Sequence, residues 1–392
     1  MAKLGEVCIQ ITDGSHNPPS GVEQSEYLML SSKNIDDDFI TLDSPRFLSH
    51  SDYIAENKRT TVSEGDLLMT IVGTIGRVAI VPEELKGICL QRSVAVIKPE
   101  REVVNNRYLM YQLQNMRPFL EKEARGVAQK GIYLKQVSQL DIKLPELEHQ
   151  MQIVKVLDKA SKLIFLRRQQ LAKLDELVKA RFVEMFGDPD QNPKGWPLVS
   201  ITEIIRDKAS NGFFAKRDAY KDDGNVQILG VSNVVNRMYS NTKELPRTNA
   251  TQAEKEKYSV KYGDMLFCRS SLVADGIGKA SIVAKGTFPN VLFECHVIRL
   301  SLDLQKCVPE FVQVLSTTPF FRRQIIAQSK TATMTTIGQD GILKSSVVLP
   351  PIDLQNQFAA FVERVDQQKQ TVQQSLEKLE LMKKALMQEY FG

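Results

Sequence analysis

One uninterrupted amphipathic segment constrains this chain most. After Leu144-Pro145, residues 150–186 contain no proline or glycine, and apolar residues recur every three or four positions. This spacing predicts one helix with a single apolar stripe along its length. At about 1.5 Å per residue, roughly 37 residues make a rod of about 55 Å, which is about three times the length of an average helix.

The same segment occurs a second time at the C-terminus. Shifted by 205 residues, Leu144-Pro145 falls on Leu349-Pro350, and the alignment continues without a gap to Phe391-Gly392. The segments that precede the two helices align with one another more loosely, as in a duplicated chain whose copies have diverged. We therefore predict a first domain, a spacer helix, a second domain and a second spacer helix, with boundaries at residues 1–143, 144–188, 189–348 and 349–392.

Each helix alone would expose its apolar stripe to water, at about 25 cal/mol per Å². Packing the two stripes together in an antiparallel, coiled-coil-like pair avoids this and relates the two halves by a pseudo-twofold axis. The expected fold class is α+β, with two mixed α/β domains separated by two long helices. The stripe residues expected to pack are Leu157, Ile164, Leu171, Leu174, Val178, Phe182, Val365, Val372, Leu379 and Leu386.

Composition excludes several classes of protein. A hydrophobic content of 42% and a charged content of 25% are ordinary for a soluble globular chain. The N-terminus lacks the apolar region of a signal peptide, and no apolar run reaches membrane-spanning length, so we expect a cytoplasmic protein without membrane contact. Five scattered cysteines without a CxxC pair argue against a disulfide framework and against a zinc site.

No catalytic motif stands out. The run His16-Asn17-Pro18-Pro19-Ser20 is similar to the Asn-Pro-Pro-aromatic motif of amino-methyltransferases, but Ser20 replaces the aromatic residue, and a polar proline turn is the simpler interpretation. Residues 73–76 and 275–278 lack the third glycine of a dinucleotide fingerprint. The four histidines show no metal-ligand spacing. We therefore predict no catalytic and no metal-binding residues.

Several loops combine basic, hydroxyl and amide side chains. Such residues can read base edges or hold phosphates, although many surface loops have this composition. A net charge of +4 is compatible with nucleic-acid binding without indicating it. The candidate DNA-contacting residues of the first domain are Ser15, His16, Asn17, Lys58, Arg59, Thr74, Arg77, Arg92, Gln129 and Lys130. Those of the second domain are Asn211, Lys216, Arg217, Asn233, Arg269, Ser270, Ser271, Lys330 and Thr333.

The repeated segment resembles the helical regions of type I restriction–modification specificity subunits. The resemblance is carried by Leu144-Pro145, by Gln150-x-Gln152 at the head of the helix, and by Arg181-Phe182 and residues 185–188 (MFGD) at its end. Gly65-Asp66 and Gly263-Asp264 look like strand motifs of the family's target recognition domains. The order of domain, helix, domain and helix matches as well, so the resemblance covers the whole chain.

The resemblance implies a DNA specificity subunit without catalytic activity. Each target recognition domain would read one half of a split, asymmetric sequence in double-stranded DNA, and the poor alignment of the domains implies two different half-sites. The paired helices would set the gap and dock two methylase (modification) subunits, which methylate adenine N6. Restriction motor subunits would add ATP-driven cleavage. S-adenosylmethionine, ATP and Mg are therefore expected only in partner subunits, and no cofactor in this chain.

Two other interpretations remain open at this point. A stand-alone DNA methyltransferase or nuclease would need a cofactor site or a carboxylate cluster, and the sequence offers neither. A coiled-coil adaptor without DNA binding would not explain why the domains beside the helices are duplicated.

Overall fold

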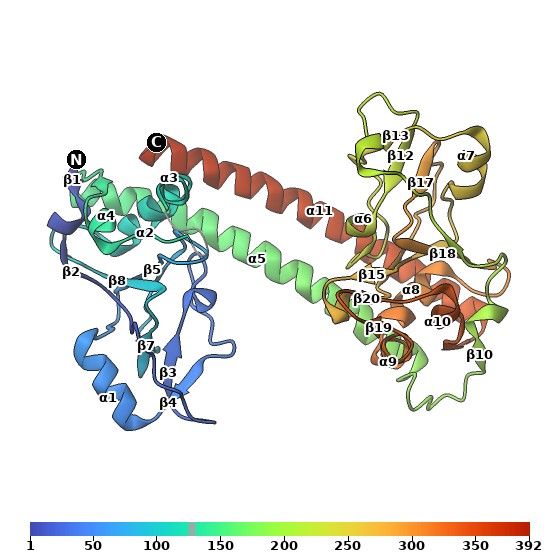
Figure 1. Ribbon diagram of the computed structural model, residues 1–392, viewed down its shortest axis with the longest axis horizontal. Coiled ribbons are helices and arrows are strands. Elements are labelled where there is room, and N and C mark those ends of the chain that lie inside the picture. Colours follow the sequence, from blue (N-terminus) through green and yellow to red (C-terminus); the bar gives the residue numbers. More distant parts are fainter. Residues whose placement is uncertain (125–129) are drawn as a thin grey trace. The chain divides into compact units, whose positions relative to one another are not determined.

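The computed structural model describes residues 1–124 and 130–392, and the chain divides into two compact units (Figure 1). Unit 1 comprises Met1–Arg168 and Gln374–Gly392, and unit 2 comprises Gln169–Gln373. Two forty-residue helices contribute to both units: α5 spans Leu147–Phe186 and α11 spans Ile352–Phe391. Each unit therefore contains one sheet-rich domain together with part of each long helix.

Unit 1 is built on a four-stranded antiparallel sheet of order β2-β8-β5-β6 and a three-stranded sheet of order β4-β3-β7, in which β3 and β7 are parallel. A two-stranded ladder joins β1 to β9. The strands are β1 (Ala2–Lys3), β2 (Cys8–Asp13), β3 (Tyr27–Leu30), β4 (Arg46–Leu48), β5 (Leu67–Thr70), β6 (Val78–Ile80), β7 (Ile88–Leu90), β8 (Val94–Pro99) and β9 (Asp141–Ile142). The helices besides α5 and α11 are η1 (Leu4–Glu6), η2 (Ser32–Asn34), α1 (His50–Arg59), α2 (Asn106–Asn115), α3 (Arg117–Glu123) and α4 (Leu134–Ser138).

Unit 2 repeats this topology. Its four-stranded sheet has the order β11-β18-β14-β16, its three-stranded sheet the order β13-β12-β17 with β12 and β17 parallel, and β10 pairs with β21. The strands are β10 (Leu198–Ser200), β11 (Ser210–Asn211), β12 (Val226–Leu229), β13 (Arg247–Thr248), β14 (Asp264–Cys268), β15 (Ser270–Ser271), β16 (Ala280–Ile282), β17 (Val291–Phe293), β18 (Val297–Ser301), β19 (Lys330–Thr331), β20 (Thr335–Thr336) and β21 (Ser346–Val348). The helices are η3 (Ile201–Glu203), η4 (Arg217–Ala219), α6 (Val231–Val234), α7 (Gln252–Tyr258), η5 (Ala274–Gly276), α8 (Pro309–Thr317), α9 (Pro319–Ala327) and α10 (Gln339–Leu343). A small additional sheet, β15-β20-β19, belongs to unit 2.

The two domains therefore share one fold although their sequences align poorly. Strand order, strand directions and the helix pair that follows each four-stranded sheet are the same in both. Their central strands β5 and β14 are buried along their whole length, which explains why both read as continuous apolar runs.

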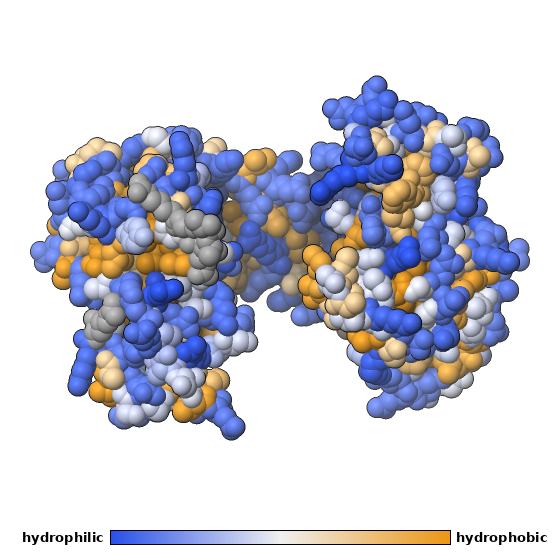
Figure 2. Space-filling model, viewed as in Figure 1, coloured by the Kyte–Doolittle hydropathy of each residue, from blue (hydrophilic) through white to orange (hydrophobic). Residues whose placement is uncertain are grey.

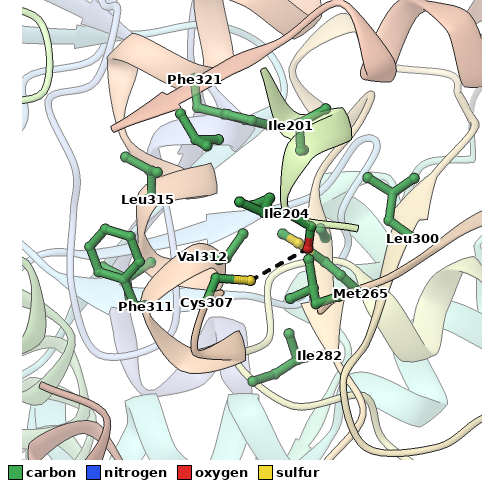
Figure 3. Close-up of a cluster of buried hydrophobic side chains, with 14 of the residues drawn as sticks. Ile201, Ile204, Met265, Ile282, Leu300, Cys307, Phe311, Val312, Leu315 and Phe321 are labelled. Atoms are coloured by element: carbon green, nitrogen blue, oxygen red, sulfur yellow. Dashed lines mark hydrogen bonds between the residues drawn. The ribbon is translucent and has the colours of Figure 1, made fainter. Parts of the chain in front are cut away.

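The core of unit 2 gathers the sheet, helices α8 and α9, and both long helices. Phe182 and Phe186 from the end of α5 meet Phe311 of α8 and Phe358 from the start of α11, with ring centroids 4.8–5.6 Å apart. All four side chains are at most 2% exposed. Around them lie the buried side chains that Figure 3 labels, among them Ile201, Met265, Leu300 and Phe321.

The core of unit 1 has the same design with the roles of the long helices exchanged. Ile153 and Leu157 come from the start of α5, and Met387 and Phe391 come from the end of α11. The Phe391 ring packs edge-on against the ring of Tyr108 of α2, and the two ring centroids are 5.3 Å apart. The tail of each long helix therefore completes the core of the unit in which the other long helix begins.

Within each unit the two helices run antiparallel. In unit 1 Arg168 pairs with Glu380 at 2.7 Å, and in unit 2 Lys369 pairs with Asp175 at 2.5 Å. These pairs are exposed and contribute at most about 1 kcal/mol each, so apolar packing holds the helices. Every predicted stripe residue is at least half-buried; Leu157, Ile164, Phe182, Val365 and Val372 are fully buried.

A buried glutamine locks the head of each long helix to its domain. The Gln150 side chain accepts from the backbone N–H of Asn105, the N-cap of α2, at 2.9 Å and donates to the Pro145 carbonyl at 2.8 Å. Gln355 makes the equivalent bonds to Val308 N–H (2.9 Å) and to the Pro350 carbonyl (2.7 Å). The first glutamine of the Gln-x-Gln motif is therefore structural, whereas Gln152 and Gln357 are exposed.

The repeated Gly-Asp motif builds the turn that enters each central strand. Gly65 and Gly263 have φ values of +79° and +92°, a conformation that favours glycine. Asp66 accepts from the Ser63 backbone N–H at 2.8 Å and pairs with Lys98 of β8, and Asp264 accepts from Lys261 N–H at 3.0 Å. Both carboxylates are buried, which explains the motif without a role in chemistry.

Some local details are not evident from the sequence pattern. Apolar residues recur at helical spacing over residues 105–124, but the chain forms two helices there, because it turns at Met116 before α3 begins with Pro at its second position. The segment that follows leads into α4, and residues 125–129 lie outside the described part of the chain. Helix α1 was not expected, since its sequence is largely polar.

One equivalent pair of positions carries different charges in the two units. In unit 1 Arg107 of α2 pairs with Asp158 of α5 at 2.7 Å. The corresponding residues of unit 2 are both acids, Glu310 of α8 and Glu363 of α11. Lys285 pairs with Glu363 at 2.5 Å, and the hydroxyls of Tyr239 and Tyr262 donate to Glu310.

Burial raises the pKa of Glu310 above its ordinary value, with the nearby Glu363 carboxylate adding to the rise. Unit 2 therefore binds an extra proton on folding and loses stability as pH rises through the folded pKa. Glu310→Gln keeps an acceptor for both tyrosines and removes this loss. The variant should have a higher urea midpoint than the parent at about pH 8, and its advantage should shrink toward about pH 4. Glu256→Gln, on the exposed side of α7, is the control and should show no such trend.

Candidate nucleic-acid interface

The predicted contact residues of unit 1 gather at one end of its four-stranded sheet. This end holds the last residues of β2 and β5 and the first residues of β6 and β8, since Asp13 is opposite Ala95 and Thr70 is opposite Val94. The connecting loops carry Ser15, His16, Asn17, Thr74, Arg77 and Arg92. Together with Lys58 and Lys130 they form what we call loop face 1.

Backbone hydrogen bonds tie these loops together. Ser15 N–H donates to Leu90 O at 2.7 Å, and Arg92 N–H donates back to Ser15 O at 2.9 Å. Thr60 Oγ1, just after α1, donates to the Asp13 carbonyl at 2.9 Å, and Gly73 N–H donates to Lys130 O at 3.2 Å. Segments far apart in sequence are thus fixed beside one another on one face.

A glycine permits the closest of these approaches. A Cβ on Gly14 would lie 2.1 Å from the Leu90 carbonyl oxygen, and one on Gly212 would lie 2.2 Å from Glu294 O. The two glycines hold equivalent places directly after β2 and β11. A side chain there would push apart the loops that carry the candidate residues, so Gly14 and Gly212 are positioning residues that the sequence analysis did not single out.

The side chains of loop face 1 differ in accessibility. His16, Asn17, Lys58, Thr74, Arg92 and Lys130 are exposed. His16 Nε2 lies 2.7 Å from Asp13 Oδ2, and Arg77 lies 3.7 Å from Asp36. Ser15 is only 6% exposed and donates to Glu56, which gives it a role inside the loop cluster. Arg59 is the last residue of α1, and Gln129 lies outside the described residues.

Unit 2 assembles an equivalent face, loop face 2. Asn211 ends β11, Arg269 follows β14, and the β15-β20-β19 sheet brings Ser270 and Ser271 beside Lys330. Arg269 N–H donates to His296 O at 2.8 Å, and Ile337 N–H donates to Arg269 O at 3.0 Å. Lys216, Arg217 and Thr333 are exposed. Lys216 precedes η4, which begins at Arg217, and Thr333 lies in the turn between β19 and β20.

Three candidates in unit 2 are committed to local contacts. Arg269 donates to the Cys295 carbonyl at 3.2 Å, and Ser271 Oγ accepts from Val273 N–H at 3.2 Å. Asn233 Oδ1 accepts from Gly230 N–H at 3.1 Å and thereby closes the turn after β12. Ser270 Oγ lies 3.3 Å from Nδ1 of the exposed His296, a neighbour that was not among the candidates.

Large apolar residues, which are not among the predicted contact residues, also stand at loop tips of this face. Phe214, Leu272 and Val273 are 69%, 82% and 66% exposed, and all three follow strands that end at loop face 2. The sequence does contain a sign of them, because the helix and strand patterns do not explain an apolar residue within a polar loop segment. The predicted contact residues are all polar or charged, so these three are not among them.

The described part of the chain also carries thiols and side chains of the types that can bind metals. No group of three or more His, Cys, Asp or Glu in the described part of the chain is arranged to hold a metal ion. Burial raises the pKa of the Cys8, Cys89 and Cys307 thiols to about 12, which keeps them protonated and unreactive at neutral pH. Among the described helices, none is both long and apolar enough to cross a membrane.

Fold and faces together define a duplicated protein, with one polar loop face on each of two domains of the same topology. Comparison with known proteins shows what such a chain is similar to. Residues 29–176 match the model of the type I restriction modification DNA specificity domain. The similar proteins are specificity subunits of type I restriction–modification systems.

Individual relatives are type I specificity subunits. The type I restriction enzyme MjaVIII specificity subunit of Methanocaldococcus jannaschii is 22% identical over 345 residues, which cover 84% of this chain and 79% of that protein. The EcoBI specificity subunit of Escherichia coli is 36% identical over 100 residues, 25% of this chain and 21% of that protein. The crystal structure of a type I S subunit from M. genitalium has a similar fold, with a TM-score of 0.57 at 11% identity, covering 100% of this chain and 95% of that one.

Proposed function

We propose that this chain selects the DNA sequence for a type I restriction–modification complex, with loop face 1 and loop face 2 each reading one half of a bipartite target. One observation carries the proposal: the two domains keep the same topology and the same clustered loop face, but place different residues on it. A shared scaffold with different base-reading side chains suits two unlike half-sites. The similarity to type I specificity subunits supports this function over a stand-alone methyltransferase or nuclease and over a coiled-coil adaptor.

We further propose that α5 and α11 form the spacer that sets the gap between half-sites and docks two methylase subunits. Several positions are identical in the two helices and exposed in both, which packing within this chain does not require. Repeated partner contacts would explain them, since two copies of one partner need two copies of its docking site. These pairs are Gln152/Gln357, Lys173/Lys378, Lys179/Lys384 and Glu184/Glu389.

The remaining components belong to the partners. In the proposed complex S-adenosylmethionine would be bound by the methylase subunits, and ATP and Mg by restriction motor subunits. The target recognition domains would correspond to residues 1–143 and 189–348, and the spacer helices to residues 144–188 and 349–392. The assembly would work in the cytoplasm, where its DNA lies.

A domain exchange tests the division of labour. Residues 198–348 are replaced by the equivalent segment of another family member, and the chimera is expressed with the methylase in cells without other adenine methylation. Single-molecule methylome sequencing should then show one changed half-site, an unchanged second half-site and an unchanged gap. A target altered in both halves would rule out independent reading by the two faces.

A further inference from the structure

Among the described residues, the most exposed large apolar side chain lies on loop face 2. Leu272 is 82% exposed and its neighbour Val273 is 66% exposed, directly after β15. In Figure 2, hydrophobic surface is visible where Figure 1 places the ends of β15 and β20. Full burial would stabilise the protein by about 1.5–3 kcal/mol for each of these two side chains, and their exposure forgoes this stabilisation. The exposed tip does not stabilise the free chain, so a binding role that would bury it is the better explanation.

The loop that presents this tip is held from several sides. Gly276 N–H donates to Val273 O at 2.9 Å, which closes the turn behind the tip. Lys279 pairs with Asp275 at 2.6 Å, and Arg322 of α9 donates to the Asp275 carbonyl at 3.0 Å. The apolar tip is therefore preorganised, and little conformational entropy would be lost when it binds.

The surroundings of the tip are polar and basic. Ser271 pairs with Thr335 of β20, and Thr331 of β19 contacts Thr335 through their hydroxyls at 3.0 Å. Exposed Lys330 stands on the same small sheet. Hydroxyl and ammonium groups are suited to phosphates, and a projecting aliphatic side chain between them is suited to a base step.

Unit 1 does not repeat this arrangement. Its equivalent loop joins β5 to β6 through residues 71–77, is shorter, and presents Gly73 and Thr74 as its exposed residues. None of its large apolar residues, Ile71, Val72 and Ile75, is exposed. Any deformation of DNA by an apolar tip should therefore be confined to one half-site.

We propose that Leu272 and Val273 form a wedge that enters the base stack of the half-site read by unit 2 and kinks the duplex there. The inference rests on the proposed function and adds a mechanical component to it. Apolar wedges of this kind partly unstack one step and bend DNA by about 20–90°. The second half-site would then be chosen in part by how easily its sequence deforms, in addition to its base edges.

The test uses the chain assembled with its methylase and a duplex carrying the target found by methylome sequencing. 2-Aminopurine placed at successive positions reports unstacking, and dyes at the two ends report bending. We expect a fluorescence increase at one step of the unit 2 half-site, none in the other half-site, and a shortened end-to-end distance. Leu272→Ser with Val273→Ser should lose both signals, and Leu272→Met with Val273→Ile should restore them.

Leu304→Ser is the matched control, since Leu304 is 45% exposed in unit 2 but lies near Gly263, at the other end of β14. It should keep both signals. A parent complex that protects both half-sites without unstacking or bending the unit 2 half-site overturns the wedge and leaves the proposed function intact. A parent complex that protects neither half-site overturns the proposed function itself. Because the parent alone decides between these outcomes, the test stands even if the serine variant folds poorly.

Discussion

Phe186→Ala is expected to lower the unfolding free energy of unit 2 by about 3–5 kcal/mol, the usual loss when a buried aromatic side chain is truncated. Phe186 is 2% exposed and contacts three other phenylalanine rings, so no neighbour can collapse into the space without moving a ring of its own. The loss should be local, because the cluster consists only of residues of unit 2. Hydrogen exchange followed by mass spectrometry should show faster exchange in residues 169–373 and unchanged exchange in residues 1–168.

Phe165→Ala, in the same helix, provides the control. Phe165 is 54% exposed, and its truncation should change stability by no more than about 0.5 kcal/mol. Equal loss of protection in both units after Phe186→Ala would mean that the chain unfolds as a single cooperative block, contrary to the division into two compact units.

Gln150→Leu is expected to destabilise unit 1 by about 2–4 kcal/mol. The substitution keeps the volume and leaves the Asn105 N–H and the Pro145 carbonyl without partners in a site where Gln150 is fully buried. Each buried group left unpaired costs about 1–3 kcal/mol. Because Asn105 caps α2, the first turn of α2 should lose hydrogen-exchange protection together with the head of α5.

Two comparisons make this result specific. Gln355→Leu should have a similar effect on unit 2, since Gln355 repeats the same bonds. Gln152→Leu removes the second glutamine of the motif, which is exposed, and should leave stability unchanged within about 0.5 kcal/mol. If Gln152→Leu reduced methylation in the assembled complex while stability stayed constant, the exposed glutamine would act in partner docking.

The large elements were predictable because their signals are local. The helical periodicity of residues 150–186, and its copy 205 residues later, predicted α5 and α11. The residues of the predicted apolar stripe are buried or half-buried, as expected. Buried strands such as β5 and β14 were visible as short apolar runs between turn signals. Polar helix α1 was missed because its packing face carries little apolar contrast, so that periodicity alone could not reveal it.

The candidate interface was predictable only as a list of loops. Polar composition pointed to residues that the fold does gather at one end of each sheet, but it could not separate exposed Arg92 from Ser15, which bonds to Glu56 forty-one residues away. Polar composition also gave no indication of Gly14, whose positioning role depends on the Leu90 carbonyl that lies against it. Contacts between residues distant in sequence do not produce a regular spacing that a sequence pattern could show.

The sequence by itself determined the duplication, the two long helices and the resemblance to type I specificity subunits, because each depends on residues close together or repeated at a constant offset. Tertiary structure decided that two poorly aligned domains have one topology, that Gln150 locks a helix cap, and that the tail of each long helix completes the core in which the other begins. It also decided which loops share a face and left Leu272 outside every core. The physical reason is that burial and hydrogen-bond satisfaction are properties of the packed chain, and they arise only when strands and helices far apart in sequence come together.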